Sequence, residues 1–495
     1  MTNRQKFVTK AAGIANVVFA GGGGVSLIAL GFFVYRHGWR GDSPLYDLTG
    51  VVLYYGVPAL LAILFFVLLR LRPVHKINAL LIGLALAVSL YGLEAFLKFL
   101  SDRDARMLRN NLIWDIEGRS KEDKAYTKAY ARNFGVDFDT RDRVEVIDDL
   151  RKRGVDAVPI VSPSNNLFVK EPDGTLKSAV KISGEEGFPL GAVSNKLTIL
   201  CNESGQHILY PSDDHGFNNP KGMWRQRQIE VAALGDSFAH GYCVGPDDNF
   251  VALIRQRFPA TLNLGMAGNG PLLTLATLKE YLPTFKPSVV LWFYFEGNDL
   301  ENLQTEKKSA LLMRYLERGF SQNLVSKQSE IDRALNDFIK VETAKWRSNR
   351  RTERPRLSRK LQEFVKLTAI RKRAGWVRPE REAIDFEADF DVNMKLFREI
   401  LSQSKSLVSS WGGRLWFVYL PEQIEHWDLR KKQRASVLSM VKSLDIPLID
   451  TLPVFQADPD YKSLFPFHGW GHFNEQGHQR VANEVLKALS VEVSH

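Results

Sequence analysis

The sequence predicts a three-layer α/β/α sandwich of flavodoxin-like type that is preceded by three transmembrane helices. Three apolar stretches, each of about twenty residues, lie near the N-terminus. From Ile229 onward, short apolar runs alternate with helical patterns, which is typical of a parallel sheet covered by helices. The chain has 495 residues, of which 45% are hydrophobic, so it can form a sizeable core and more than one domain.

The apolar stretches cover residues 11–35, 48–69 and 77–100. The first is too long for a typical secretory signal and lacks a clear small-residue cleavage site, so we expect it to be retained. Basic residues are more frequent in the N-terminal tail and the second loop than in the first loop. This distribution predicts a multi-pass inner-membrane protein whose chain beyond residue 100 lies on the periplasmic side. Arg103, Arg106 and Arg109 count against this orientation, although they begin a long domain, whose charges weigh less.

We expect three parts: a membrane region (1–100), a membrane-proximal cap (101–228), and a domain (229–495) with a basic helical insertion at about 300–391. In the cap, residues 139–154 have the pattern of a capped amphipathic helix that ends at a glycine. A short strand at 157–161 follows, and then a loop-rich stretch to residue 191. Residues 197–201 and 207–210 predict a hairpin around a short polar turn.

The net charge of +10 is concentrated in the insertion. Residues 340–378 contain fourteen basic residues against three acidic ones, so the rest of the chain is near neutral. A solvated helical face, attraction to anionic lipid or glycan, and nucleic acid are the alternatives, in decreasing order of preference. Trp346 and Trp376 favour a membrane surface over nucleic acid, because indoles sit well at the level of lipid headgroups.

The expected core elements alternate regularly along the chain. The strands are predicted at 229–234, 260–264, 289–295, 414–420 and 447–451, and the helices at 249–257, 271–282, 393–409, 432–444 and 475–489. Since parallel strands place their carboxyl ends at one edge, and open α/β sheets bind ligands there, the residues that follow the first three strands should meet. These residues are Ser237, Gly268 and Asn298.

Such residue types suit acyl transfer. The Ser237 hydroxyl can attack a carbonyl, while the N–H groups of Ser237 and Gly268 and the amide of Asn298 can hold the oxyanion that develops. A general base is still required, and His472, between a loop and the final helix, is the candidate. His240 and His478 are expected to pack rather than react.

Four motifs in this order resemble those of the SGNH (GDSL-type) hydrolase superfamily, as found in membrane-anchored bacterial members. The motifs are Gly-Asp-Ser-Phe (235–238), the turn at Gly268, Gly-Asn-Asp (297–299) and Gly-His-Phe-Asn (471–474). The resemblance covers about half of the chain, from Ile229 to the C-terminus with the insertion. It implies that Ser237 is the nucleophile, that His472 is the base, and that Ser237, Gly268 and Asn298 form the oxyanion hole.

The chain departs from the family pattern at two positions. The third motif usually begins with glycine, where this chain has Glu296, which is tolerable if its side chain points away from the site. The family usually carries an aspartate three residues before the histidine, and that position here is Gly469. Either the site is a Ser-His dyad or another carboxylate orients His472, and Asp450, at the end of the preceding strand, is the candidate.

Cys201 and Cys243 are the only two cysteines. In an oxidising compartment they could form a disulfide, and otherwise they would be two separate buried thiols. The sequence contains neither a Cys/His pattern with metal-ligand spacing nor a phosphate-binding Gly-Lys-Ser/Thr motif. We therefore expect no metal and no cofactor.

These features together predict a membrane-anchored serine esterase that removes O-acyl groups, acetyl in the first instance, from a cell-envelope carbohydrate or a lipid-linked substrate. An O-acyltransferase would use the same serine and histidine, with a sugar hydroxyl in place of water. A non-catalytic envelope binding module is the alternative from a different class, and its support is the aspartate missing at Gly469. The expected partners are the lipid bilayer and a carbohydrate or acyl-ester substrate, with no nucleic acid; the sequence does not determine the oligomeric state.

Overall fold

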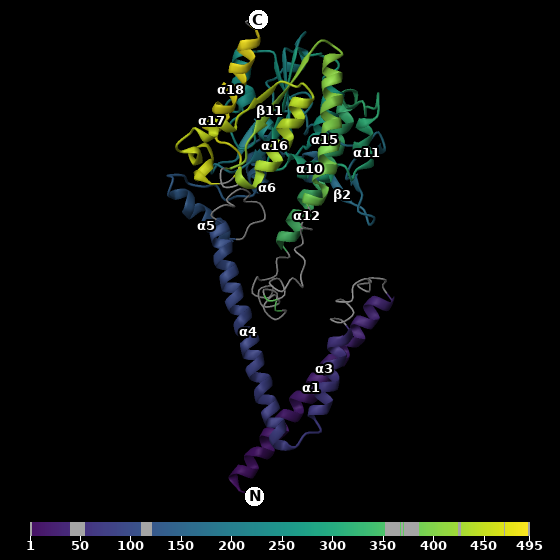
Figure 1. The fold of residues 1–495 in the computed structure, drawn as a ribbon, viewed down its shortest axis with the longest axis vertical. Coiled ribbons are helices and arrows are strands. Elements are labelled where there is room, and N and C mark those ends of the chain that lie inside the picture. The colour runs from purple at the N-terminus through teal and green to yellow at the C-terminus, as the bar shows by residue number, and fades with distance from the viewer. Residues whose placement is uncertain are drawn as a thin grey trace. The chain divides into compact units, whose positions relative to one another are not determined.

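The computed structural model describes residues 2–39, 55–109, 121–351, 367, 370, 386–423, 427–469 and 471–493. The chain divides into two compact units (Figure 1). One unit comprises Met1–Asp104 together with Arg354–Glu380, and the other comprises Ala105–Glu353 together with Arg381–His495. The predicted cap and the predicted hydrolase domain therefore form one compact unit.

The N-terminal unit contains three apolar helices, α1 (Asn3–Trp39), α3 (Val57–Leu68) and α4 (Pro73–Arg109). Two segments are long and apolar enough to cross a membrane, Asn3–Tyr35 and Pro73–Leu97, each with a mean hydropathy of 2.1. In the second of the three predicted spans (48–69), the structure describes the 12-residue helix α3, which is shorter than the roughly twenty residues that a crossing requires. The beginning of that predicted span, residues 48–54, lies outside the described residues.

Small residues allow α1 and α3 to pack closely. A Cβ atom placed on Gly22 would lie 2.7 Å from the Phe65 ring, so a larger residue there would require the ring to move. The rings of Phe19 and Phe65 are 6.4 Å apart. Small residues at a helix interface are the usual basis of helix association in lipid, where apolar burial supplies no driving force. Within the same unit, the buried Glu94 of α4 accepts a hydrogen bond from the Ile370 N–H at 2.8 Å.

The second unit is built on a five-stranded parallel sheet. Its strands are β8 (Val231–Leu234), β9 (Thr261–Asn263), β10 (Val289–Phe295), β11 (Arg414–Leu420) and β12 (Leu448–Asp450), in the order β12-β11-β10-β8-β9. Counted along the chain this is the flavodoxin-like order 2-1-3-4-5, which switches direction between β8 and β10. All five strands were predicted from the sequence.

Side chains of β10 alternate between two core clusters, as the period of two of a strand requires. Val290, Trp292 and Tyr294 join one cluster, and Leu291 and Phe293 join the other. Helices α9 (Pro271–Tyr281), α15 (Phe386–Ser409) and α16 (Trp427–Ser443) contribute to the first cluster, and α8 (Phe250–Arg257) and α18 (Glu475–Val493) to the second. Both faces of the sheet are thus covered by helices, with α15 and α18 on opposite sides (Figure 1).

The cap forms a small sheet with the order β1-β6-β7, from β1 (Ala157–Pro159), β6 (Leu197–Cys201) and β7 (Ile208–Pro211). Helix α6 (Arg143–Lys152) begins with a capping box between Asp142 and Glu145, as its sequence predicts. The hairpin β6–β7 also forms where it was expected. The remaining cap elements are α5 (Lys121–Arg132), η2 (Pro163–Leu167), β2 (Phe168–Lys170), β3 (Leu176–Ser178), β4 (Lys181–Ile182), β5 (Glu185–Glu186) and η3 (Met223–Arg225).

The insertion after β10 begins with helices, as predicted. It contains α10 (Asp299–Glu306), α11 (Ala310–Met313), η4 (Arg314–Leu316), η5 (Leu324–Lys327) and α12 (Gln328–Arg351). Most of the predicted insertion beyond residue 351 lies outside the described residues. Between the core strands and the C-terminus lie α7 (Ser237–His240), α17 (Leu452–Gln456), η7 (Tyr461–Leu464) and η8 (Pro466–His468).

Candidate active site

Ser237 is presented by a tight turn between β8 and α7. A Cβ atom on Gly235 would lie 2.8 Å from the Phe293 carbonyl oxygen, so the turn passes close to β10 only because this residue is glycine. The Asp236 carboxylate accepts the Phe238 N–H at 2.9 Å and so caps the short helix that Ser237 begins. This turn fixes the serine hydroxyl at the carboxyl end of the sheet.

His472 meets Ser237 as predicted. The Nε2 atom of His472 lies 2.7 Å from Ser237 Oγ, which is hydrogen-bonding distance between a nucleophile and its base. The two residues are 235 positions apart in the sequence, and the sheet brings their loops together.

The carboxylate that orients His472 is Glu203. Its Oε1 and Oε2 atoms lie 2.9 and 3.1 Å from His472 Nδ1, and Oε2 also accepts the His472 backbone N–H at 3.1 Å. A carboxylate at Nδ1 fixes the tautomer that leaves Nε2 free to accept the serine proton. Ser237, His472 and Glu203 therefore form a Ser-His-Glu relay, and the site is not a dyad.

Asp450 does not orient His472, so the prediction that this carboxylate does so was wrong. Its carboxylate pairs with Arg434, and it also accepts the Leu452 N–H at 3.2 Å. Glu203 lies 269 residues before His472, in the turn between β6 and β7, and so outside the C-terminal region that contains Asp450 and Gly469. The one signal in the sequence was an acidic residue within the short Asn-Glu-Ser-Gly turn of the predicted hairpin.

The predicted oxyanion groups come from the ends of three adjacent strands. Gly268 has φ of +80°, and its loop is joined to the serine turn by the hydrogen bond from Met266 N–H to Gly235 O at 3.1 Å. Among the described residues, the N–H groups of Ser237 and Gly268 have no protein acceptor, which leaves both available to a substrate oxygen. The Asn298 amide lies beside Asp236, and its Oδ1 atom is buried without a hydrogen-bond partner.

Two buried carboxylates lie close to the serine turn: Asp236, which directly precedes Ser237, and Asp299, which interacts with Asp236. Burial raises the pKa of Asp236 to about 6. Burial, together with the nearby charge of Asp236, raises the pKa of Asp299 well above its ordinary value. Asp299 accepts the Phe295 N–H at 3.1 Å, and Asp236 accepts the Phe238 N–H, so both carboxylates hold their loops by hydrogen bonds.

The other histidines of the region are structural. His240 and His478 are fully buried, and burial lowers the pKa of each to about 3, so both are neutral. His478 accepts the Phe250 N–H at 3.1 Å. Glu296, the departure in the third motif, accepts hydrogen bonds from the Tyr419 hydroxyl and the Glu422 N–H. These two hydrogen bonds hold the Glu296 side chain against β11 and the loop that follows β11.

The charge state of His472 predicts the pH dependence of the site. Burial lowers the pKa of His472, but the charge and hydrogen bonds of Glu203 outweigh burial and hold this pKa above the ordinary 6.5. A base must be neutral to accept a proton, so kcat/KM should rise with pH through an apparent pKa above 6.5. The Glu203→Gln substitution removes the negative charge that raises the pKa of His472. We therefore expect the rise of kcat/KM on the acidic side of the pH profile (the acidic limb) to move to lower pH. A kcat/KM profile that does not move would contradict the assignment of Glu203.

Cys201 and Cys243 form a disulfide bond, with their Cα atoms 5.4 Å apart. The sequence left open whether they pair. Cys243, Glu203 and His472 each offer a ligand-type atom, and these three atoms lie within 4.8 Å of one another. A disulfide sulfur is not a thiolate, so this cluster does not have the donor set of a metal site in the oxidised protein.

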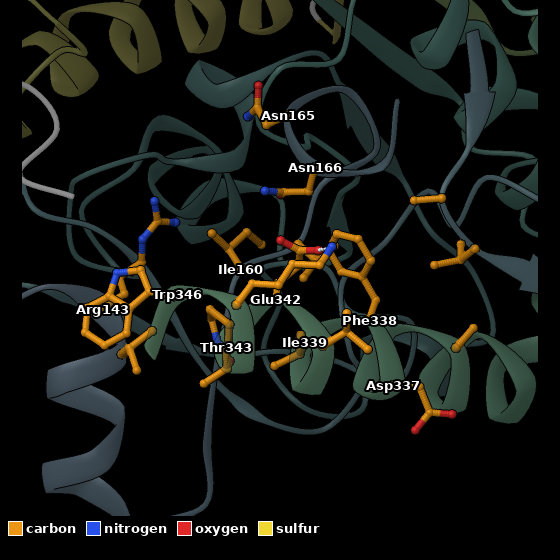
Figure 2. A pocket seen from close by; sticks show the side chains of 18 of the residues that line it. Arg143, Ile160, Asn165, Asn166, Asp337, Phe338, Ile339, Glu342, Thr343 and Trp346 are labelled. Atoms are coloured by element: carbon orange, nitrogen blue, oxygen red, sulfur yellow. Dashed lines mark hydrogen bonds and ion pairs between the residues drawn. The ribbon is translucent and has the colours of Figure 1, made fainter. Parts of the chain in front are cut away.

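A groove of about 850 Å³ lies between the cap and α12 (Figure 2). Its floor is aliphatic and aromatic, with Ile160 and Phe338 on facing sides, while Arg143 and Trp346 lie together at one end. Asn165 at the other side connects it with the oxyanion loop, because its amide donates to the Ala267 carbonyl oxygen at 3.3 Å.

The walls of the groove are held by polar contacts between the cap and α12. Asp332 accepts hydrogen bonds from the N–H and hydroxyl of Ser194, at 2.9 and 2.7 Å. Arg347 pairs with Asp148 at 2.7 Å. Contacts at both ends of the helix thus fix the width of the groove.

A serine hydroxyl, a histidine ring and a carboxylate in hydrogen-bond contact at the carboxyl end of a parallel sheet have the arrangement of a serine-hydrolase site. No protein-family model matches the chain, and no curated protein matches it.

Several solved structures are similar to part of the chain, and the three described here each have a TM-score of 0.29. A putative lipolytic protein of the G-D-S-L family from Desulfitobacterium hafniense is 12% identical, with 52% of this chain and 98% of that chain covered. A lipase/acylhydrolase from Enterococcus faecalis is 12% identical, with 54% and 97% covered. An acetyl xylan esterase is 10% identical, with 52% and 99% covered.

Proposed function

We propose that this protein is a membrane-anchored serine esterase that hydrolyses O-acyl esters, with acetyl as the acyl group and a cell-envelope carbohydrate or lipid-linked glycan as the carrier. The observation that supports this proposal most strongly is the continuous relay from Ser237 Oγ through His472 to the Glu203 carboxylate. Glu203 also removes the argument for a non-catalytic binding module, because that argument rested on the absence of an orienting carboxylate.

In the proposed acylation step, Ser237 Oγ bonds to the ester carbonyl carbon while its proton passes to His472 Nε2. Glu203 stabilises the imidazolium, and the N–H groups of Ser237 and Gly268, with the Asn298 amide, hold the oxyanion. The C–O bond to the sugar then breaks, and His472 returns the proton to the departing alkoxide. Water, deprotonated by His472, releases the acid and restores the Ser237 hydroxyl.

The location outside the cytoplasm is part of the proposal. Two long apolar helices support an anchor. The distribution of basic residues favours the periplasmic side with three crossings, so the proposal includes a crossing by the middle apolar stretch (48–69); two crossings from a cytoplasmic N-terminus would end in the cytoplasm. The Cys201–Cys243 disulfide supports this side, because disulfides persist in oxidising compartments and are rare in the cytosol.

The residues that line the groove support the proposal that the acyl group is attached to a carbohydrate. Its apolar floor and its edges of amide, guanidinium and indole groups suit a sugar chain, whose rings have apolar faces and hydroxyl rims. The charged lining residues nearly balance, with Arg143, Lys181 and Lys345 against Asp337 and Glu342, so a neutral glycan fits better than a polyanion.

The Trp346→Ala variant tests this groove. Loss of one aromatic contact of about 0.5–1.5 kcal/mol should raise KM for an acetylated oligosaccharide roughly 2- to 10-fold. KM and kcat for p-nitrophenyl acetate, which carries no glycan chain to fill the groove, should not change. Equal effects on the two substrates, or no effect on either, would contradict a glycan-binding role.

The proposed activity is tested with the full chain in detergent micelles. Release of acetate from p-nitrophenyl acetate and from acetylated xylo-oligosaccharide is expected, and its loss in Ser237→Ala would assign it to this site. Transfer of acetyl from the ester to an added oligosaccharide, without matching acetate release, would identify an O-acyltransferase instead. Absence of both reactions would contradict the proposal.

A further inference from the structure

Glu203 belongs to a different substructure from the other two members of the relay. Ser237 and His472 lie in loops that join elements of the five-stranded sheet, whereas Glu203 lies in the turn between β6 and β7 of the cap sheet. The geometry of the relay therefore depends on how firmly that turn is attached to the core.

Hydrogen bonds within the cap shape this turn. Asn202 Nδ2 donates to the Asp139 carbonyl oxygen at 2.7 Å, and the Asp139 N–H donates to the Gly205 carbonyl oxygen at 2.8 Å. The Gly205 N–H donates to Asn202 Oδ1 at 3.0 Å. All of these partners are cap residues, so these bonds set the shape of the turn without fastening it to the strands that carry Ser237.

The disulfide supplies that attachment. Within the described residues, residues 201–205 have two covalent or hydrogen-bonded links to the core: the Cys201–Cys243 bond and the hydrogen bonds of Glu203 to His472. Cys201 stands two residues before Glu203, and Cys243 stands six residues after Ser237. Both cysteines are buried, and Cys243 Sγ belongs to the group of atoms, with those of Glu203 and His472, that lie within 4.8 Å of one another.

We propose that the Cys201–Cys243 disulfide is a positioning element of the active site, which holds the Glu203 carboxylate against His472, and that its reduction slows the enzyme while the fold persists. This inference rests on the proposed esterase function. A dithiol is the reductant: it donates two electrons and two protons to the S–S bond, which breaks into two thiols, and the dithiol becomes a disulfide.

The expected loss is moderate, because the turn keeps its cap hydrogen bonds. A displacement of about 1 Å in a catalytic constellation can cost roughly 100-fold, so we expect kcat/KM to fall about 10- to 100-fold. The Glu203 carboxylate would then also lie farther from the His472 ring. Among the described groups, Glu203 and Asp236 raise the pKa of His472, while burial lowers it, so a displaced Glu203 lowers this pKa.

A double-mutant cycle on the full chain in detergent tests the inference. It compares wild type, Cys201→Ser/Cys243→Ser, Glu203→Gln, and the combination of all three substitutions, with p-nitrophenyl acetate as substrate. If the disulfide acts through Glu203, the cysteine substitutions lower kcat/KM about 10- to 100-fold in wild type but little in the Glu203→Gln background. The acidic limb of the pH profile should also shift to lower pH when the disulfide is removed.

Dithiothreitol provides a second measurement that does not depend on how the variants fold. Wild type should lose activity on reduction and regain it on reoxidation, whereas Cys201→Ser/Cys243→Ser should not respond. Equal losses in both backgrounds of the cycle would show a general structural role and overturn the inference, as would a reduced wild type with full activity. Failure of the proposed function would look different, because oxidised wild type would then hydrolyse no ester.

Discussion

Ser237→Ala is expected to lower kcat by about 10⁶-fold, because removing the nucleophile of a serine relay costs about as much as removing the whole relay. Only the oxyanion donors and substrate binding would remain, and these leave a residual rate above that of the uncatalysed reaction. The measurement is steady-state hydrolysis of p-nitrophenyl acetate by the detergent-solubilised chain. KM should change much less than kcat, because the hydroxyl acts in the bond-forming step.

The control for Ser237→Ala is the thermal unfolding temperature, which should stay close to that of wild type. Ser237 is buried, and its hydroxyl contacts His472 at 2.7 Å, so a small change in stability is compatible with the account. A variant that keeps more than a few per cent of the wild-type kcat would show that another residue performs the chemistry.

Glu203→Gln is expected to lower kcat by about 10³- to 10⁴-fold, since an amide at this position stabilises neither the required tautomer nor the imidazolium. The amide is nearly the same size as the carboxylate, so packing around the buried side chain is retained. The same kinetic assay measures the effect, with substrate held above KM.

Asp450→Asn is the matched control for this substitution. It is the same change from carboxylate to amide, made at a residue that pairs with Arg434 rather than with His472. We expect kcat to stay within about 3-fold of wild type and the effect to appear as lowered stability, by about 0.5–3 kcal/mol. The reverse result, a large kinetic effect at Asp450 and none at Glu203, would contradict the relay.

The sequence was sufficient to predict the residues whose positions follow from the sheet. Ser237, Gly268 and Asn298 each follow a buried strand, and strand ends of a parallel sheet meet at one edge whatever the loop lengths. His472 could be predicted because its motif directly precedes the last helix, which packs beside α8 and brings that loop to the same edge. Residues that directly follow a strand or precede a helix could therefore be assigned to this edge of the sheet from the sequence.

Glu203 could not be predicted in the same way. Its place depends on how the cap packs against the core, and neither periodicity nor turn chemistry specifies that packing. The same limit applied to the disulfide, since the spacing of Cys201 and Cys243 does not say that their strand and loop come together. For the middle apolar stretch (48–69), the structure describes a helix of 12 residues, and residues 48–54 lie outside the described part of the chain.

Covalent labelling of the full chain with a fluorophosphonate, followed by mass spectrometry of the peptides, shows whether Ser237 is an activated nucleophile. We expect a single adduct on Ser237, formed much more slowly in His472→Ala and in Glu203→Gln. An intact protein that acquires no adduct, or an adduct on a different serine, would contradict this expectation.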